Sequence, residues 1–173
     1  NNSVGGSTTQ SWISRKSMEL NHQTVDLLND TYFNPMVQPW VSQRKADNLV
    51  DSKNYDLKVR HPFDPTFLFD TGIYPIKNFN IKGVIWYHGE SNAEMPDVHS
   101  LLFESLVSDW RMHWGKPEMP FYFVQLSSLN RPTWGEFRDS QRSSLDIPFT
   151  GMAISSDVGN PKDVHPKNKW IVG

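Results

Sequence analysis

Short apolar runs recur along the chain. They occupy residues 81–87, 121–126 and 150–155, and longer segments of mixed polarity separate them. Continuous apolar runs of this length are typical of strands that are buried on both faces of a parallel sheet. Because helical patterns lie between the runs, strands and helices are expected to alternate. That alternation predicts an α/β fold with a mostly parallel sheet and helices on its faces.

Helical periodicity is clearest between the first two apolar runs. Leu102, Leu106 and Trp110 recur at a spacing of four residues, which predicts a helix over residues 99–114. Gly115 follows at the position where a glycine often ends a helix. The segment is therefore expected to connect two parallel strands.

The chain before residue 65 gives weaker signals. Residues 1–4 resemble the end of a strand, and a helix is expected to begin near Ser7 or Thr8, either of which can cap it. Residues 20–64 are polar and contain several prolines. One helix over residues 37–50 and a long loop are expected there.

Polar residues follow directly on the first apolar run. His88, Gly89, Glu90, Ser91 and Asn92 are consecutive. In open α/β sheets, ligands and catalytic groups gather at the carboxyl ends of the strands, so this loop is a candidate site. The alternative is an ordinary loop between a strand and a helix, with polar capping residues.

Two further segments carry candidate chemistry. Asp163 and His165 follow the third apolar run, and a histidine beside a carboxylate is the arrangement of a general base with an orienting partner. Gly5 and Gly6 are adjacent near the start of the chain. Paired glycines let backbone N–H groups approach a ligand closely, and such groups can bind a developing oxyanion.

Together these segments resemble the sialate O-acetylesterase family, a carbohydrate-esterase branch of the SGNH hydrolase superfamily. The matching blocks occur in family order and span nearly the whole chain. They are N-S-V-G-G-S-T-T-Q-S-W-I-S at 2–14, P-T-F-L-F-D-T-G-I-Y-P-I at 65–76, I-K-G-V-I-W-Y-H-G-E-S-N-A at 81–93, V-Q-L at 124–126, W-G-E-F-R-D-S-Q-R at 134–142 and D-V-H-P-K-N-K at 163–169.

The resemblance implies a three-layer α/β sandwich of the SGNH-hydrolase, flavodoxin-like kind, incomplete at both ends. Residues 1–173 are expected to form a single partial catalytic domain, in which 20–64 is a poorly matched insertion or loop region. The family's nucleophile is a serine in a glycine-rich turn, yet no G-D-S or G-Q-S sequence occurs here. The chain alone is therefore expected to be inactive, and the missing N-terminal segment of its own domain is an expected partner.

The resemblance also assigns roles to the C-terminal pair. His165 would be the base that activates the serine, and Asp163 would orient and stabilise its imidazole. The superfamily usually has two residues between the aspartate and the histidine, whereas only Val164 separates them here. A backbone carbonyl is the alternative orienting group, which would leave a dyad.

The oxyanion hole is expected to combine backbone and side-chain donors. Gly5 or Gly6 would supply an N–H group, and His88 stands where family members commonly carry glutamine. Asn92 is the rival side-chain donor. Glu90 and Gly89 are expected to support the loop. No metal is expected, because His88 and Glu90 have no third ligand at a suitable spacing.

A helix is expected over residues 134–145, and Trp134, Arg138 and Gln141 share one face of it. A tryptophan can stack on a sugar ring, and an arginine can hold a carboxylate with two hydrogen bonds. The three are therefore candidates for substrate binding. The alternative is an amphipathic helix with its tryptophan at the edge of the core and a solvated arginine.

The composition narrows the classes of partner. A net charge of −2 gives no reason to expect nucleic acid or an anionic membrane as a partner. There is no cysteine for a disulfide, and no apolar run approaches the roughly 20 residues of a membrane span. The aromatic content of 13%, with seven tryptophans, suits a globular domain and contact with carbohydrate.

The resemblance thus implies a serine hydrolase that removes O-acetyl groups from sialic acid, works without a cofactor, and is secreted or periplasmic. Two alternatives stay open. One is deacetylation of another sugar, such as xylan, and the other is non-catalytic glycan binding on the same scaffold. A serine in a glycine-rich turn upstream of Asn1 would favour the enzyme over the binding protein.

Overall fold

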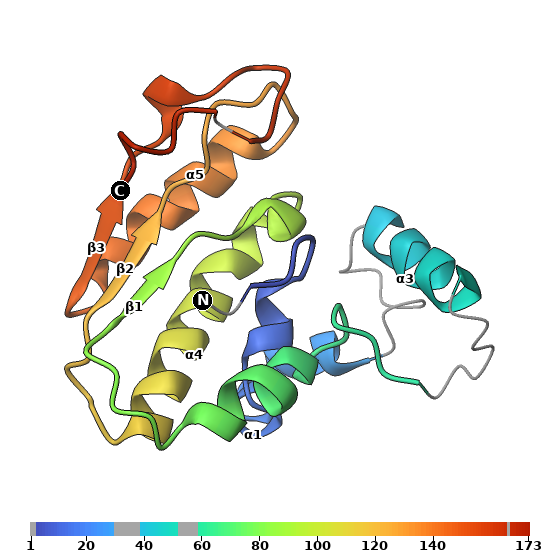
Figure 1. Cartoon of the computed structure of the whole chain (residues 1–173), viewed down its shortest axis with the longest axis vertical. Helices are drawn as coiled ribbons and strands as arrows, with labels where there is room; N and C mark the ends of the chain where they lie inside the picture. The colour runs from blue at the N-terminus through green and yellow to red at the C-terminus, as the bar shows by residue number, and fades with distance from the viewer. Residues whose placement is uncertain (1–2, 30–38, 52–58, 166) are drawn as a thin grey trace.

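The computed structural model describes residues 3–29, 39–51, 59–165 and 167–173, and Figure 1 shows a small sheet with helical elements on one side of it. In chain order the helical elements are η1 (Thr9–Trp12), α1 (Arg15–Glu19), α2 (His22–Val25), η2 (Asp26–Leu28), α3 (Pro39–Asp51), the π-helical turn η3 (Phe69–Ile73), η4 (Tyr74–Ile76), η5 (Glu90–Asn92), α4 (Pro96–Trp114), α5 (Trp134–Ser143), η6 (Ser144–Asp146) and η7 (Ser156–Val158). None of the helices in the described ranges combines the length and apolar character needed to cross a bilayer.

The sheet contains three parallel strands in the order β1-β2-β3. They are β1 (Val84–Trp86), β2 (Phe121–Val124) and β3 (Thr150–Ala153), and each is shorter than the apolar run that predicted it. Consecutive strands are neighbours, and helical segments connect them, as a parallel sheet requires. The prediction of an α/β fold with a parallel sheet is confirmed.

Helix α4 packs on one face of the sheet. Phe103 of α4 contacts the rings of Phe121 and Phe123, and Trp110 contacts Trp86 and Phe121. These aromatic contacts lie inside the main hydrophobic core. Helix α5 lies beside α4 over the same face (Figure 1).

Helix α4 begins and ends with the expected signals. It starts at Pro96, three residues before the predicted boundary, because proline fits the first turn of a helix without losing a hydrogen bond. It ends at Gly115, whose left-handed φ of +60° lets its N–H bond the carbonyls of Arg111 and Met112. The prediction that Gly115 ends the helix is confirmed.

The opposite face of the sheet is exposed. Ile85 and Tyr122 are partners in the register of β1 and β2, and they are 84% and 57% exposed. Their side chains point away from α4, because strand residues alternate between faces. The described residues therefore form two layers. One layer is the sheet, and the other consists of the helices that pack on the face carrying α4 and α5.

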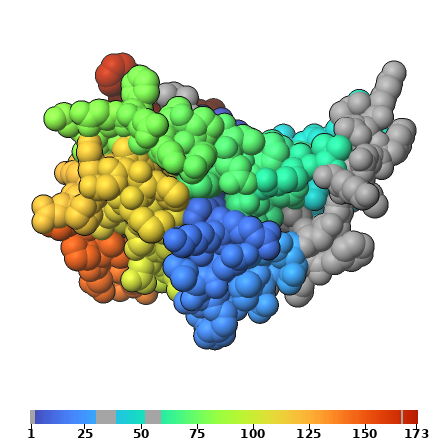
Figure 2. All heavy atoms as spheres, turned by 90° about the horizontal axis from the view of Figure 1, so that it is seen from below, coloured from blue at the N-terminus to red at the C-terminus, as the bar shows by residue number. Residues whose placement is uncertain are grey.

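The N-terminal segment differs from its prediction. Residues 3 and 4 form no strand, and instead of one helix from Ser7 or Thr8 the chain makes the short turn η1 and then α1. The break occurs because the buried carboxylate of Asp109 on α4 accepts hydrogen bonds from the Ser14 backbone N–H and from the hydroxyls of Ser14 and Ser17. This anchor fixes the N-terminal segment against α4. Figure 2 shows its blue surface directly against the green surface of the segment that precedes β1.

Candidate functional site

A cleft of about 670 Å³ opens at the carboxyl end of β1. Its walls come from segments far apart in the sequence: the N-terminal turn, β1 with the loop that follows it, α3, the loop after β2, and the C-terminal segment. The position agrees with the rule that ligands bind beyond the carboxyl ends of parallel strands. The three segments singled out in the sequence meet in this cleft.

The paired glycines form a turn at the cleft wall. The turn is closed by a hydrogen bond from the Ser7 N–H to the Val4 carbonyl, and Gly6 has a φ of +80°. A Cβ on Gly6 would lie 3.0 Å from Phe63, so glycine is favoured by both conformation and space. Among the described residues, the N–H groups of Gly5 and Gly6 have no acceptor. These two N–H groups are therefore available to a ligand.

The loop after β1 packs against helix α5 at Gly89. Gly89 has a φ of +143°, and a Cβ there would lie 2.9 Å from the ring of Phe137 on α5. Glu90 faces the cleft. Burial raises the pKa of Glu90. The close approach of Gly89 to Phe137 packs the loop against α5, and a supporting role for Gly89 and Glu90 stays a prediction.

His88 lines the cleft, but its donor is already engaged. Its Nε2–H donates to the carbonyl oxygen of Ser7 over 2.8 Å, and burial lowers the pKa of His88 to about 4. The neutral ring therefore has one N–H, which Ser7 occupies, and an unprotonated Nδ1. Nδ1 is buried and has no partner among the described residues. The expectation that His88 donates to an oxyanion does not fit this arrangement.

Asn92, the rival donor, is fully buried beneath the loop. Its Oδ1 accepts hydrogen bonds from the N–H and the hydroxyl of Thr9, and its Nδ2 donates to Gln10. Asn92 is absent from the cleft wall. The expectation of an oxyanion donor here is wrong, because the amide joins the loop after β1 to η1 instead.

His165 lies at the cleft with an exposed side chain. Its Nδ1 is 4.0 Å from Oδ1 of Asp163, which is beyond hydrogen-bond distance, and that same oxygen accepts the His165 backbone N–H over 2.9 Å. Asp163 thus holds the loop through the backbone N–H of His165, and no hydrogen bond joins its carboxylate to the imidazole. Only Val164 separates the two residues, and at this short spacing the aspartate bonds the backbone of His165 and not its ring.

The cleft contains serines, but none of those described hydrogen-bonds His165. The Ser7 hydroxyl donates to the Val4 carbonyl and accepts from the Trp12 indole N–H. The Ser91 hydroxyl donates to the Gly6 carbonyl. Both hydroxyls therefore stabilise the glycine turn. The Ser7 hydroxyl also lies 3.3 Å from Nε2 of His88, but that nitrogen carries the proton donated to the Ser7 carbonyl and so cannot act as its base.

The residues expected to bind substrate on α5 face the interior instead. Trp134 is buried, and its indole N–H donates to the Ser127 carbonyl. Gln141 is buried and bonds the backbone of Leu126, while the guanidinium of Arg138 donates to Gln125. None of the three lines the cleft. The expectation is wrong for this helix face, because tertiary packing takes the tryptophan into the core.

Sequence reasoning missed a group of cations and an aromatic residue at the cleft. They are Trp40 and Arg44 on α3, Arg131 in the loop after β2, and Lys169, whose Nζ lies 5.0 Å from the ring centre of Tyr87. The spacing of Trp40 and Arg44 by four residues was visible in the predicted helix. No local signal showed that this helix face meets the glycine turn.

A metal site was not expected from the sequence. Across residues 3–29, 39–51, 59–165 and 167–173, no group of three or more His, Cys, Asp or Glu side chains is arranged to hold a metal ion.

Comparison with known proteins gives consistent matches. A model of the carbohydrate esterase family described as sialic acid-specific acetylesterase matches residues 68–169. The sialate O-acetylesterases of Mus musculus and Rattus norvegicus are 28% and 29% identical to the chain, over 98% of it and 36% of each relative. The crystal structure of a carbohydrate acetylesterase from Xanthomonas citri superposes with a TM-score of 0.70 at 30% identity, over 99% of this chain and 33% of that one. The chain thus spans about a third of the length of these proteins.

Proposed function

Because this chain belongs to the family of sialic acid-specific acetylesterases, we propose that the full-length protein removes O-acetyl groups from sialic acid. The observation that carries the proposal is the cleft, which brings the His165 imidazole and the open N–H groups of Gly5 and Gly6 together from opposite ends of the chain. A base and oxyanion donors are the groups that acyl transfer to a serine requires.

The proposed reaction proceeds through an acetyl-enzyme. A serine hydroxyl, expected outside the segments described here, attacks the acetyl carbonyl while His165 accepts its proton. The carbonyl oxygen becomes negative and is bound by the N–H groups of Gly5 and Gly6. His165 then gives the proton to the departing sugar oxygen. Water, activated by the same imidazole, releases acetate and regenerates the serine.

Asp163 is proposed to assist through its charge. A carboxylate 4.0 Å from the Nδ1 of His165 stabilises the imidazolium that forms during each step. Because no hydrogen bond links the two side chains, its contribution is expected to be smaller than that of a bonded triad partner. The exposed position of both side chains further weakens the attraction.

We also propose that residues 1–173 belong to one catalytic domain, because the cleft uses residues from Gly5 to Lys169. By resemblance to the family, the proposed setting is secreted or periplasmic.

The proposal is tested by measuring acetate release by the full-length protein from O-acetylated sialic acid, acetylxylan and p-nitrophenyl acetate. The expected result is the highest kcat/KM for the sialic acid derivative. A preference for acetylxylan would assign another sugar as substrate. Binding of the acetylated sugars without any release of acetate would contradict esterase activity and favour a glycan-binding protein.

A further inference from the structure

Helix α3 presents an aromatic and a cationic side chain to the cleft. Trp40 and Arg44 are four residues apart, so they share one helix face, and both line the cleft. A Cβ on Gly6 would lie 3.7 Å from the Trp40 ring, which places the indole beside the glycine turn. This is the combination that the sequence suggested for α5, found instead on an element that matches the family poorly.

The helix is tied to the segment that follows it. The ammonium of Lys45 lies 2.7 Å from the Asp64 carboxylate, and the Lys45 side chain is only 4% exposed. The Asn48 amide contacts Nε2 of His61 at 3.0 Å. Val41 and Phe63 are buried against one another in a small apolar cluster. The face of α3 opposite the solvent is therefore held by an ion pair, a polar contact and apolar packing.

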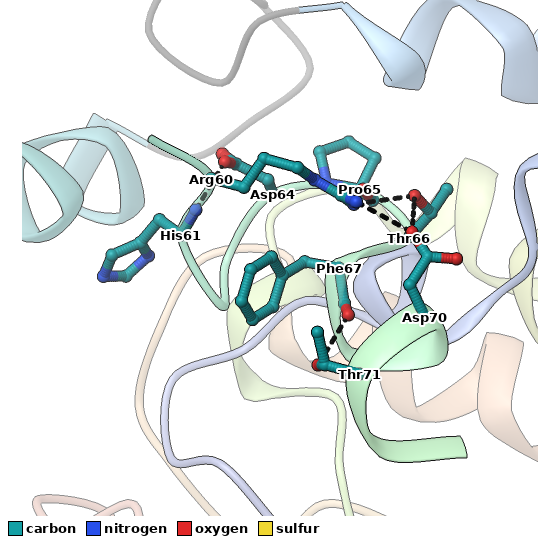
Figure 3. A network of polar contacts seen from close by, with 8 residues as sticks. All are labelled: Arg60, His61, Asp64, Pro65, Thr66, Phe67, Asp70 and Thr71. Carbon is teal, nitrogen blue, oxygen red and sulfur yellow. Dashed lines mark hydrogen bonds and ion pairs between the residues drawn. The ribbon is translucent and has the colours of Figure 1, made fainter. Parts of the chain in front are cut away.

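The segment after α3 is in turn tied to the body of the protein. Figure 3 shows Arg60 reaching toward Asp70 and Thr66, with hydrogen bonds of 2.8 and 2.9 Å. The Thr66 N–H donates to the carbonyl of Gln10, whose side chain accepts from Asn92 under the loop after β1. A continuous series of contacts thus fixes the position of α3 relative to the cleft.

The charge of the cleft favours an anionic ligand. Arg44, Arg131 and Lys169 line it, whereas Glu90 is the acidic side chain in its wall. Within the described ranges, Arg44 pairs with no carboxylate. A guanidinium binds a carboxylate with two parallel hydrogen bonds, and an indole ring packs on the apolar face of a sugar.

We infer that α3 is the substrate-recognition element of this cleft, in which Arg44 binds the carboxylate of an acidic sugar and Trp40 packs against the sugar ring. The inference rests on the proposed function for the identity of the sugar. It adds that selection of an anionic over a neutral acetylated sugar is made by a helix that carries none of the proposed catalytic groups.

The test compares Arg44→Gln with Arg142→Gln in the full-length protein. Arg142 is an exposed arginine on α5 that is absent from the cleft wall, so it is a matched control. The substrates are O-acetylated sialic acid, its methyl ester, which lacks the negative charge, and p-nitrophenyl acetate. Arg44→Gln is expected to lower kcat/KM for the acid by about 10- to 100-fold, mainly through KM, because one charge-assisted pair is lost. The two neutral substrates are expected to be unaffected, and so is every substrate in Arg142→Gln.

A Trp40→Phe variant keeps an aromatic ring and should fold. It is expected to lose kcat/KM for both the acid and its methyl ester, by less than Arg44→Gln loses for the acid. Equal kcat/KM for the acid in the wild type and in Arg44→Gln would overturn the inference while leaving the proposed function intact.

If the wild type releases no acetate from the sugar, the proposed function fails, and calorimetric titration with free sialic acid decides the inference separately. Binding that Arg44→Gln weakens would support it. Binding that is absent, or equal in both proteins, would overturn it.

Discussion

The Nε2–H of His88 donates to the carbonyl oxygen of Ser7 over 2.8 Å, and this bond joins the loop after β1 to the N-terminal glycine turn. The histidine therefore positions the backbone that carries the Gly5 and Gly6 N–H groups. In the full-length protein, His88→Ala is expected to lower kcat by roughly 10- to 100-fold, because misplaced donors stabilise the transition state poorly.

His88→Gln is expected to recover most of that activity, since an amide N–H can donate to the same carbonyl. Steady-state kinetics of both variants checks the role. If His88→Ala kept the wild-type kcat, the tether between the loop and the turn would have no part in catalysis.

Gly89 supports a second prediction, which concerns stability. Its φ of +143° and the Phe137 ring 2.9 Å from a Cβ leave no room for alanine. Gly89→Ala is expected to lower the free energy of unfolding by about 1–3 kcal/mol. The matched control is Gly135→Ala on α5, where a Cβ would have nothing within 4 Å.

Because Gly135 lies within a helix, its replacement by alanine is expected to be neutral or slightly stabilising. Urea denaturation of the two variants gives the comparison. Equal free energies of unfolding in both variants would contradict the prediction, because they would show that the loop accommodates an alanine at position 89 without loss of stability.

Local patterns predicted the regular elements well. The apolar runs identified β1, β2 and β3, and the periodicity of Leu102, Leu106 and Trp110 identified α4, because each signal lies within the element that it predicts. The strands are shorter than the runs: β1 begins three residues after the start of its run, and β2 and β3 each end two residues before theirs.

Side-chain roles were harder to predict because they depend on distant partners. The amide of Asn92 is taken by Thr9 and Gln10, which are more than eighty residues away in the sequence. Trp134 looked equally suited to the core or to a sugar, and only packing around Phe137 decides between them. The same limit applies to Trp40, whose place at the cleft depends on contacts between α3 and the segment after it.

Two buried histidines make stability depend on pH. Burial lowers the pKa of His99 to about 3 and that of His88 to about 4. In the unfolded chain both take up a proton near pH 6.5. The unfolded state therefore binds more protons below that pH, and the free energy of unfolding falls as the pH drops from about 6.5 toward 4. Each histidine contributes a slope of up to about 1.4 kcal/mol per pH unit.

His99→Leu is expected to remove the contribution of His99 to this slope, because the ring is buried between Phe103 and Phe137 and makes no hydrogen bond through Nδ1 within the described residues. Denaturation of the full-length protein at pH 7 and at pH 5 measures it. The exposed His22 offers the control variant His22→Gln, which should leave the slope unchanged. A His99→Leu protein with the wild-type dependence on pH would contradict the assignment.

The exposed sheet face leads to a prediction for the 173-residue chain on its own. Ile85 and Tyr122 form an apolar surface beside β1, which has no neighbour on its other edge among the strands of the described ranges, and such surfaces promote association. The isolated chain is expected to self-associate, and Ile85→Lys is expected to reduce the association. Leu20→Lys changes a residue outside the sheet that is 78% exposed, against 84% for Ile85, and serves as the control. Sedimentation velocity that finds the unmodified chain monomeric would count against this surface.

His165 carries the central claim, because the proposed chemistry needs a base at the cleft. The most direct measurement is kcat for acetate release from O-acetylated sialic acid by the full-length protein and its His165→Ala variant. The expected loss is at least ~10³-fold, as for removal of the base from a serine hydrolase, and Asp163→Asn is expected to lose less. A His165→Ala protein that folds and releases acetate at the wild-type rate would contradict the account.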